Sequence, residues 1–404
     1  MLRNYVRLVR KHPKPVGFGI MHYFFSSYGQ SFFLSLFVPS ILESFRINNN
    51  EFSVIYSAAT LTSALLLSYL GPSTDRCDIR KVSLANGAML GFFCLSMYFT
   101  ANLPLLLFTL IGLRLSGFGM MPLTGAAAVG KFFHKNRGKA LALSSIGMSI
   151  AEMGAPVLIV LLLHSWGWQI PWLFFLISLT VIFGPLSAWL GRSLRASKSA
   201  RRSDKYPIEP LKRRKLLKNP GFLLLASVVV FSPFMTTGFF IHQNLILGNK
   251  LWTPEWLASC FVGFGACRIL ATLLSGPFID KFTAKRVAFL IPLPITAGLL
   301  LLTFTDHALT LLFYLSMNGL SLSFGSLTGT ALWAELYGSR SLGTVKSLVS
   351  TLMAVGTAIS PLIFGEIFQD KATMEYGFLT MALLGILLSG VIYYYLNFRY
   401  RKMN

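Results

Sequence analysis

The stretch GPSTDRCDIRKV at residues 71–82 returns as GPFIDKFTAKRV at residues 276–287, which is 205 positions further along a chain of 404 residues. Glycine, proline, aspartate and valine recur in register, and basic residues match at three further positions. A short charged turn that recurs half a chain away indicates that a larger unit is duplicated.

Two more markers repeat at nearly the same offset. The triplet LTG occurs at residues 123–125 and again at 327–329, and glycine–proline pairs of identical spacing begin at Gly138 and Gly343. Parallel repeats of this kind, related by an axis along the membrane normal, are an architecture of secondary transporters whose substrate site lies near the bilayer midplane.

The composition is that of a membrane protein. Hydrophobic residues make up 54% of the chain and charged residues 12%, with a mean hydropathy of +0.63, whereas soluble domains carry about 25% charged residues. The apolar residues fall in blocks long enough to cross a bilayer, and such spans are helices because lipid offers no partner for backbone polar groups. We therefore expect an all-α membrane protein with twelve transmembrane helices. The predicted spans are 15–44, 52–71, 82–102, 104–130, 138–164, 169–191, 220–247, 254–278, 286–305, 308–334, 343–367 and 375–397.

The net charge of +22 follows the predicted topology. With the N-terminus inside, the inner segments hold 31 of the 36 lysines and arginines, and the outer loops hold only Arg46, Lys250 and Lys371. This bias is the positive-inside signature, so we expect both termini in the cytoplasm and no nucleic-acid partner.

The longest polar segment divides the chain. We expect an N-terminal six-helix bundle at residues 1–191, a basic cytoplasmic linker at 192–219 and a C-terminal six-helix bundle at 220–404. The four cysteines lack metal spacing and form no outer pair, which argues against metal sites and disulfides. The sequence also lacks a phosphate-binding GxxxxGK[ST] loop and a catalytic triad, so an ATP-driven pump and an enzyme are disfavoured.

The repeated turn resembles the signature loop of the major facilitator superfamily, in which a glycine precedes an aspartate, a basic residue and then a basic pair. RLSGFG, which begins at Arg114, and GMSIAEMGAP in the fifth span are similar to two further motifs of the family. The resemblance covers essentially the whole chain and implies the major facilitator fold in two parallel six-helix repeats. The loop residues concerned are Gly71, Asp75, Arg76, Arg80 and Lys81, and Gly276, Asp280, Lys281, Lys285 and Arg286.

In that family the loop is associated with conformational switching. Asp75 is expected to accept hydrogen bonds from a neighbouring helix N-terminus, where the helix dipole favours an anion. The basic residues would bridge to the other half when the cytoplasmic side is closed, so that the two loops act as a gate latch. A purely topological role would explain Arg80 and Lys81 but not the repeated aspartate.

Arg268, near the middle of the eighth span, is the first candidate for substrate binding. A buried charge is usually functional or paired, and a guanidinium matches a carboxylate in shape and charge. In the monocarboxylate and oxalate–formate branches of the superfamily, which the chain resembles here, an arginine of this span faces the substrate carboxylate. The chain departs from many monocarboxylate carriers at position 264, which is Phe. The alternative is a structural arginine paired with Glu152 or a backbone carbonyl.

Five further residues are candidates within the spans. Glu152 is either a proton carrier or the permanent counter-ion of a buried arginine. Arg114 matches an arginine that the family uses for proton coupling in some branches and for packing in others. His22 either takes part in proton coupling or substrate binding, or is simply a hydrogen-bonded core histidine. Tyr28 and Gln30 are expected to orient a small polar substrate.

The sequence therefore predicts a secondary active transporter in the cell inner (plasma) membrane. We expect a monomer without cofactors that moves a small organic solute by alternating access with proton symport. Two buried arginines against one buried glutamate favour an organic anion such as a monocarboxylate. Drug or metabolite efflux by a member of the same superfamily is the alternative, and it would require an acidic cavity. A non-transporting membrane sensor is a third possibility.

Overall fold

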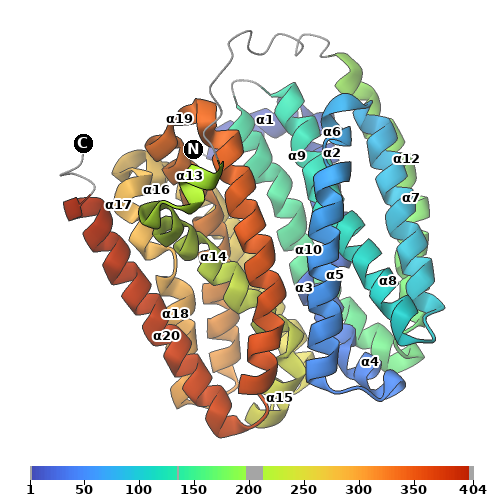
Figure 1. The fold of residues 1–404 in the computed structure, drawn as a ribbon. Coiled ribbons are helices and arrows are strands. Elements are labelled where there is room, and N and C mark those ends of the chain that lie inside the picture. Colours follow the sequence, from blue (N-terminus) through green and yellow to red (C-terminus); the bar gives the residue numbers. More distant parts are fainter. Residues whose placement is uncertain (1, 134–135, 197–212, 400–404) are drawn as a thin grey trace. The chain divides into compact units, whose positions relative to one another are not determined.

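A computed structural model describes residues 2–133, 136–196 and 213–399 of the chain (Figure 1). These residues form helices and connecting turns, without β-strands. The chain divides into two compact units, residues 1–205 and 206–404, which are described separately below. Residues 197–212, the central part of the predicted linker, lie outside the described residues.

Unit 1 contains long helices interrupted at specific points by tighter or wider turns. Its elements are α1 Leu2–Lys11, α2 Pro13–Phe25, η1 Ser26–Gly29, α3 Ser31–Leu34, η2 Ser35–Phe37, α4 Val38–Phe45, α5 Asn49–Leu70, α6 Ser73–Arg76, α7 Ile79–Tyr98, α8 Leu103–Leu113, η3 Arg114–Met120, α9 Met121–Phe132, α10 Arg137–Trp166, α11 Ile170–Ser178, η4 Leu179–Phe183, α12 Gly184–Gly191 and η5 Arg192–Ala196. The segments η3 and η4 are π-helical, whereas η1 and η2 are 3₁₀-helical.

Unit 2 has fewer interruptions. Its elements are α13 Arg213–Leu217, α14 Pro220–Ile241, α15 Gln243–Lys250, α16 Pro254–Phe282, α17 Ala284–Val287, η7 Ala288–Leu290, α18 Leu293–Phe304, α19 Leu309–Ile367, α20 Lys371–Tyr394 and η8 Tyr395–Arg399. Helix α19 covers two predicted spans, and its two arms meet at Gly338, whose φ of 74° and ψ of 160° break the helix. Glycine adopts this conformation readily because it has no Cβ atom.

The predicted count of twelve spans is confirmed only in part. In the part of the chain that the structure describes, nine helices are long and apolar enough to cross a membrane, so the protein is a multi-pass membrane protein. The predicted spans 15–44, 82–102 and 308–334 are helical but are not among the nine. Residues 15–44 are broken at Gln30, which is extended, and only the shorter apolar stretch Ser31–Phe45 remains.

Polar residues at the predicted loop positions fix where the helices begin. Asn48 accepts a hydrogen bond from the Glu51 amide and Glu51 returns one to the Asn48 amide, so a complete capping box starts α5. Thr253 and Asp370 cap α16 and α20, each through a side-chain oxygen that accepts a hydrogen bond from an amide of the first turn. Such caps satisfy amides that the first helical turn leaves unpaired.

An ion cluster joins three of the predicted outer loops of unit 2. The Lys250 ammonium is fully buried and lies 2.5 Å from Asp306 Oδ1 and 2.7 Å from Glu375 Oε1. Lys371 pairs with the second carboxylate oxygen of Asp306, and the Trp252 indole donates to the Asp306 carbonyl at 2.8 Å. Two of the three lysines and arginines predicted on the outer side are therefore neutralised by acids of other loops.

Candidate functional site

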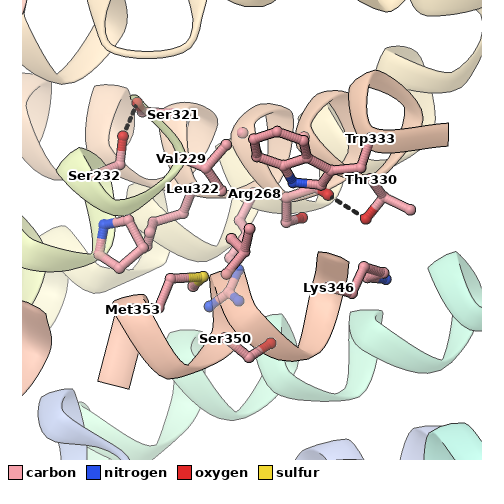
Figure 2. Close-up of a pocket in the computed structure, with 15 residues that line it drawn as sticks. Val229, Ser232, Arg268, Ser321, Leu322, Thr330, Trp333, Lys346, Ser350 and Met353 are labelled. Carbon is pink, nitrogen blue, oxygen red and sulfur yellow. Dashed lines mark hydrogen bonds between the residues drawn. The ribbon is translucent and has the colours of Figure 1, made fainter. Parts of the chain in front are cut away.

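A pocket of about 280 Å³ lies within unit 2, among helices α14, α16 and α19 (Figure 2). Among the residues that the structure describes, its lining contains two cationic side chains, several hydroxyl groups and an indole, but no acidic residue. The lining residues are Val229, Ser232, Pro233, Arg268, Ser321, Leu322, Gly325, Ser326, Gly329, Thr330, Trp333, Lys346, Val349, Ser350 and Met353.

The break at Gly338 lets α19 supply two sides of this pocket. Trp333 and Thr330 come from the arm before the break, while Lys346, Ser350 and Met353 come from the arm after it. Figure 2 shows these residues around the Arg268 side chain, which comes from α16.

Arg268 sits where α16 packs against α19. Its guanidinium carbon lies 6.0 Å from the centre of the Phe264 ring, within the range of a cation–π contact. The Thr272 hydroxyl, one turn later, donates to the Arg268 carbonyl at 2.8 Å and lies 3.1 Å from Ser323 Oγ of α19. The position that departs from the resembled carriers, Phe264, is thus occupied by the ring that faces this arginine.

The opposite wall of the pocket is a chain of hydroxyl groups. Ser232 Oγ and Ser321 Oγ are 2.8 Å apart, and Ser321 donates to the Ile291 carbonyl at 2.6 Å. One turn along α14, Thr236 donates to Asn318 Oδ1 at 2.7 Å. These bonds join α14 to α19 and tie α19 to the turn before α18.

Lys346 is the pocket residue that the sequence argument missed. The sequence places it among the inner basic residues, because a lysine at the start of a span is typical of a topology signal. The structure instead places it in the lining of the pocket together with Arg268. A usable signal was its position, one helical turn before Ser350 and two before Met353 on a face rich in small or hydroxyl residues.

His22 is held inside unit 1 by both ring nitrogens. Its Nδ1 lies 2.8 Å from the Phe18 carbonyl oxygen and its Nε2 lies 2.8 Å from Ser83 Oγ. Ser83 Oγ is in turn 2.6 Å from Ser187 Oγ. The network ties α2 to α7 and α12, and the imidazole is fully buried. This geometry matches the structural alternative for His22.

Tyr28 and Gln30 lie at the break in the first span. Tyr28 is buried in η1, and its hydroxyl is 2.7 Å from Ser178 Oγ of α11. Gln30 separates η1 from α3, and its backbone amide donates to the Ser27 carbonyl at 2.9 Å. Tyr28 is therefore engaged with another helix, whereas Gln30 shapes the backbone.

Arg114 is buried in the π-helical segment η3 with 1% of its surface exposed. Its Nη1 donates to the Gly29 carbonyl at 3.0 Å, and its guanidinium carbon lies 4.1 Å from the Phe118 ring centre and 5.1 Å from that of Tyr56. Within the described residues Arg114 forms no ion pair, so Glu152 is not its counter-ion; the Nε and Nη2 atoms find no hydrogen-bond partner there. Wide π-helical turns are frequent at functional sites.

The first and fourth predicted spans of unit 1 touch through their backbones beside Arg114. A Cβ atom at Gly117 would lie 2.6 Å from the Gly29 amide nitrogen, and one at Gly29 would lie 2.1 Å from the Leu113 carbonyl oxygen. Neither position has room for a side chain. Glu152 lies on α10 of the same unit and is 3% exposed, the only acidic side chain buried so deeply among the described residues.

A related contact occurs in unit 2. When the repeats are aligned on their LTG triplets, Arg114 corresponds to Asn318. Asn318 is fully buried and joins α19 to α14 through Thr236, as Arg114 joins η3 to the first span through Gly29. The equivalent position of each repeat, Arg114 or Asn318, thus makes a hydrogen bond between the first and fourth predicted spans of that repeat.

The first repeated turn is exposed around Asp75. The Lys131 ammonium lies 3.7 Å from the Asp75 carboxylate and donates to the Thr74 carbonyl at 2.5 Å. The N-terminus of α7 is capped by Asp78, which accepts from the Arg80 amide at 2.9 Å and pairs with the Arg80 guanidinium at 3.3 Å. The capping role expected of Asp75 therefore belongs to Asp78, because Asp78 immediately precedes the helix.

Gly71 and Arg76 are the remaining candidate residues of the first turn. Gly71 continues α5 into α6, and its amide donates to the Leu67 carbonyl at 2.7 Å. Arg76 ends α6 and is exposed. Arg76 and Asp75 are therefore accessible, as a contact with another part of the chain requires.

The second turn is fixed by an acid from α19. Glu335 accepts hydrogen bonds from the Ala284 amide at 2.8 Å and the Lys285 amide at 3.1 Å, at the start of α17. In the same turn Gly276 lies within α16, while Asp280, Lys281 and Arg286 are exposed. Both turns thus keep their charged groups at the surface of their own unit.

Comparison with known proteins identifies the fold. The sequence model of the Major Facilitator Superfamily matches residues 20–251 and 250–403. A bacterial homologue of the human lysosomal transporter Spinster, solved in an inward-facing and unoccupied conformation, is similar over 95% of this chain and 96% of its own, with 14% identity and a TM-score of 0.70. The nucleoside transporter NupG is similar over 94% and 98%, with 11% identity and a TM-score of 0.70. Among curated proteins, none matches the chain significantly.

Proposed function

Because the chain belongs to the Major Facilitator Superfamily and is a transporter rather than an enzyme, we propose that it moves a small organic anion across the membrane by alternating access. The observation that carries this proposal is the pocket of unit 2, which within the described part of the chain is lined by Arg268 and Lys346 and by no acidic residue. A pocket of that charge favours an anionic substrate over a neutral or cationic one.

The chemistry of the lining supports a carboxylate. Arg268 offers a planar fork of donors that matches a carboxylate, whereas Lys346 offers a compact ammonium. Ser232, Ser350 and Thr330 add neutral hydroxyl groups, and the Trp333 indole gives an apolar surface. The volume of about 280 Å³ lies below the usual range for drug-sized ligands and suits a small solute such as a monocarboxylate.

Protons are the proposed coupling ion. Glu152 is the deeply buried carboxyl group of unit 1, and a buried carboxyl that gains and loses a proton would link transport to the proton gradient. Arg114, which lies in the π-helical segment with two guanidinium nitrogens lacking a hydrogen-bond partner, is the second coupling residue of the proposal. His22 has a lesser claim because both of its ring nitrogens are engaged.

Efflux of lipophilic or cationic compounds remains the alternative within the superfamily. A cation would be favoured by acidic groups at its site, and the pocket lining has none. The proposed location is the cell inner membrane with both termini cytoplasmic, as the distribution of basic residues favours. The two turns around Asp75 and Asp280 are proposed to act as gate latches.

The first experiment measures ligand-dependent thermal stabilisation of the purified protein against small carboxylates, amino acids, sugars and lipophilic cations. We expect a carboxylate to raise the melting temperature of the wild type, and this shift to be lost in Arg268→Lys and reduced in Lys346→Gln. Lys218→Gln, which removes an exposed lysine of unit 2 outside the pocket, is the matched control. Stabilisation by lipophilic cations alone, unchanged in both pocket variants, would move the assignment to efflux.

Proton coupling is tested separately in proteoliposomes. Uptake of the stabilising carboxylate is measured with and without an inward proton gradient. We expect the gradient to drive accumulation in the wild type, and Glu152→Gln to abolish that accumulation while leaving carboxylate-dependent stabilisation in place. Accumulation that ignores the gradient, or that persists in Glu152→Gln, would remove protons or Glu152 from the mechanism.

A further inference from the structure

A second hollow of unit 2 is a wide apolar groove of about 800 Å³. Helix α16 forms one wall, while the start of α18 and the first arm of α19 form the rest. Apart from Ser275 and Lys281 its lining is apolar. The lining residues are Leu270, Ala271, Leu274, Ser275, Pro277, Phe278, Lys281, Phe282, Leu290, Leu293, Pro294, Leu320 and Phe324.

The groove follows from how the two helices beside it are built. Helix α16 continues unbroken to Phe282, whereas the chain after α17 passes through a 3₁₀ turn and Pro292 before α18 begins at Leu293. A proline at the start of a helix has no amide to donate and fixes the local backbone. The groove lies beside the last three turns of α16, next to this turn and the start of α18.

One stripe of α16 faces this opening. Its four large apolar residues are spaced four apart, which places them on one face of the helix. They are between 38% and 63% exposed although they are strongly apolar, so in the membrane they face lipid. The four residues are Leu270, Leu274, Phe278 and Phe282.

The length of the stripe matches the thickness of one lipid leaflet, and a lysine lies at one end of it. From Leu270 to Phe282 the helix rises by about 18 Å, since each residue adds about 1.5 Å, and half of a hydrocarbon core measures about 15 Å. Lys281 stands at the end of the groove that the positive-inside rule predicts to be cytoplasmic, with its ammonium 5.1 Å from the centre of the Phe282 ring. Lys285 and Arg286 follow in the same turn. Two acids are near: Asp280 in the turn itself, and Glu335, which accepts from the Lys285 amide at 3.1 Å.

We propose that this groove is a binding site for an anionic phospholipid of that leaflet, with one acyl chain along α16 and the phosphate at Lys281. The apolar stripe accounts for the chain, and the cation at the headgroup depth accounts for the preference for negative charge. The site is independent of the substrate pocket, because among their lining residues the two share none. A neutral phospholipid or a second copy of the chain are the competing occupants.

The test is native mass spectrometry of the purified protein in detergent, titrated with phosphatidylglycerol or phosphatidylcholine of identical chains. We expect phosphatidylglycerol to be retained in preference. Lys281→Gln should lower its retention about fivefold, the effect of one lysine near a headgroup. Arg76→Gln removes the basic residue at the same position of the first repeated turn and should leave retention unchanged.

A second pair of variants tests the apolar part of the groove. Leu274→Trp should lower the retention of both lipids, because a larger side chain fills the groove from an exposed position. Leu65→Trp, at a similarly exposed position of α5, should lower neither. Melting curves confirm that each variant is folded.

Three results would overturn the proposal. Equal retention of the two lipids by the wild type would remove the charge preference. Equal losses in Lys281→Gln and Arg76→Gln would assign the effect to overall charge. A dimer that Leu274→Trp disrupts would give the groove to a second copy of the chain.

Discussion

Lys131 and Glu335 occupy the same position of the two repeats when these are aligned on their LTG triplets, yet they bind the repeated turn through opposite charges. Lys131 donates to the Thr74 carbonyl, whereas Glu335 accepts from the Ala284 and Lys285 amides. Each charge therefore matches the backbone group that its own turn presents: a carbonyl in unit 1 and the amides of a helix start in unit 2.

Replacing Glu335 should loosen the second turn. A carboxylate that accepts two amide hydrogen bonds at a helix N-terminus contributes about 1 kcal/mol or more, so Glu335→Gln should lower the melting temperature modestly and Glu335→Lys further. Thermal unfolding of the purified variants measures this. Glu43→Gln, an exposed glutamate of unit 1, is the control. If Glu335→Lys were as stable as the wild type, the contact would contribute nothing.

The ion cluster around Lys250 predicts that the stability of the protein falls at acid pH. Hydrogen bonds from Lys250 and then Lys371 hold the pKa of the Asp306 carboxyl below its usual range. A carboxyl whose pKa is lower in the folded state stabilises the protein above its unfolded pKa of about 3.9, and this stability is lost as the pH falls through the folded pKa. We expect the melting temperature to drop below about pH 4. Asp306→Asn should flatten that drop, and Asp280→Asn, in the second repeated turn, should keep the wild-type profile.

Removing the two partners of the cluster should have unequal effects. Without Asp306 and Glu375 the buried Lys250 ammonium has lost both acids, and stranding one member of a buried pair costs about 3–5 kcal/mol. Lys250→Met should cost less, because it keeps the volume of the stem and leaves two acids that are partly exposed to water. The measurement compares the melting temperatures of Lys250→Met and the Asp306→Asn, Glu375→Gln double variant. The reverse order would mean that water reaches Lys250.

The network around His22 predicts a loss of stability without a loss of ligand binding. Ser83→Ala removes the hydroxyl at Nε2 of a fully buried imidazole, which should cost about 1–3 kcal/mol. Stabilisation by the carboxylate found in the screen should remain. Ser145→Ala, on α10, is the matched control because its hydroxyl bonds only within its own helix. A ligand response that disappears in Ser83→Ala with an unchanged melting temperature would return His22 to the substrate site.

The backbone contact between Gly29 and Gly117 predicts a strong steric effect. An alanine methyl at Gly117 would lie 2.6 Å from a backbone nitrogen, so the two helices would have to separate, at a cost of about 3 kcal/mol. Gly154→Ala, on α10 with open space around the position, is the control and should be tolerated. Expression level and melting temperature report the difference. Equal behaviour of the two variants would mean that the helices move apart freely.

Local pattern predicted the helical class, the repeat and most of the spans. It predicted the first span as one helix because hydropathy is high throughout residues 15–44. The break at Gln30 accompanies the close approach of Gly29 to Gly117, a contact between distant segments that no window of sequence contains.

Only part of the candidate site could be predicted from the sequence, because the rest again depends on contacts between distant segments. Arg268 was identified because a charge in the middle of a span is conspicuous, and the structure places it in a pocket. Lys346 was missed because its sequence neighbourhood is also that of a topology signal. The partners of His22, Ser83 and Ser187, are ordinary serines in sequence and acquire a role only when three helices pack together.

The joint at Gly338 gives the pocket an unusual mechanical property. Trp333 stands five residues before the joint and Lys346 eight residues after it, and rigid helix connects each of them to it. A rotation about the backbone bonds of Gly338 would therefore move the wall that carries Trp333 relative to the wall that carries Lys346, so that the residue acts as a hinge. A side chain at this position would strain the backbone, because the conformation of Gly338 is one that other residues rarely adopt. The two dihedral angles of Gly338 would therefore set the distance between these two walls of the pocket.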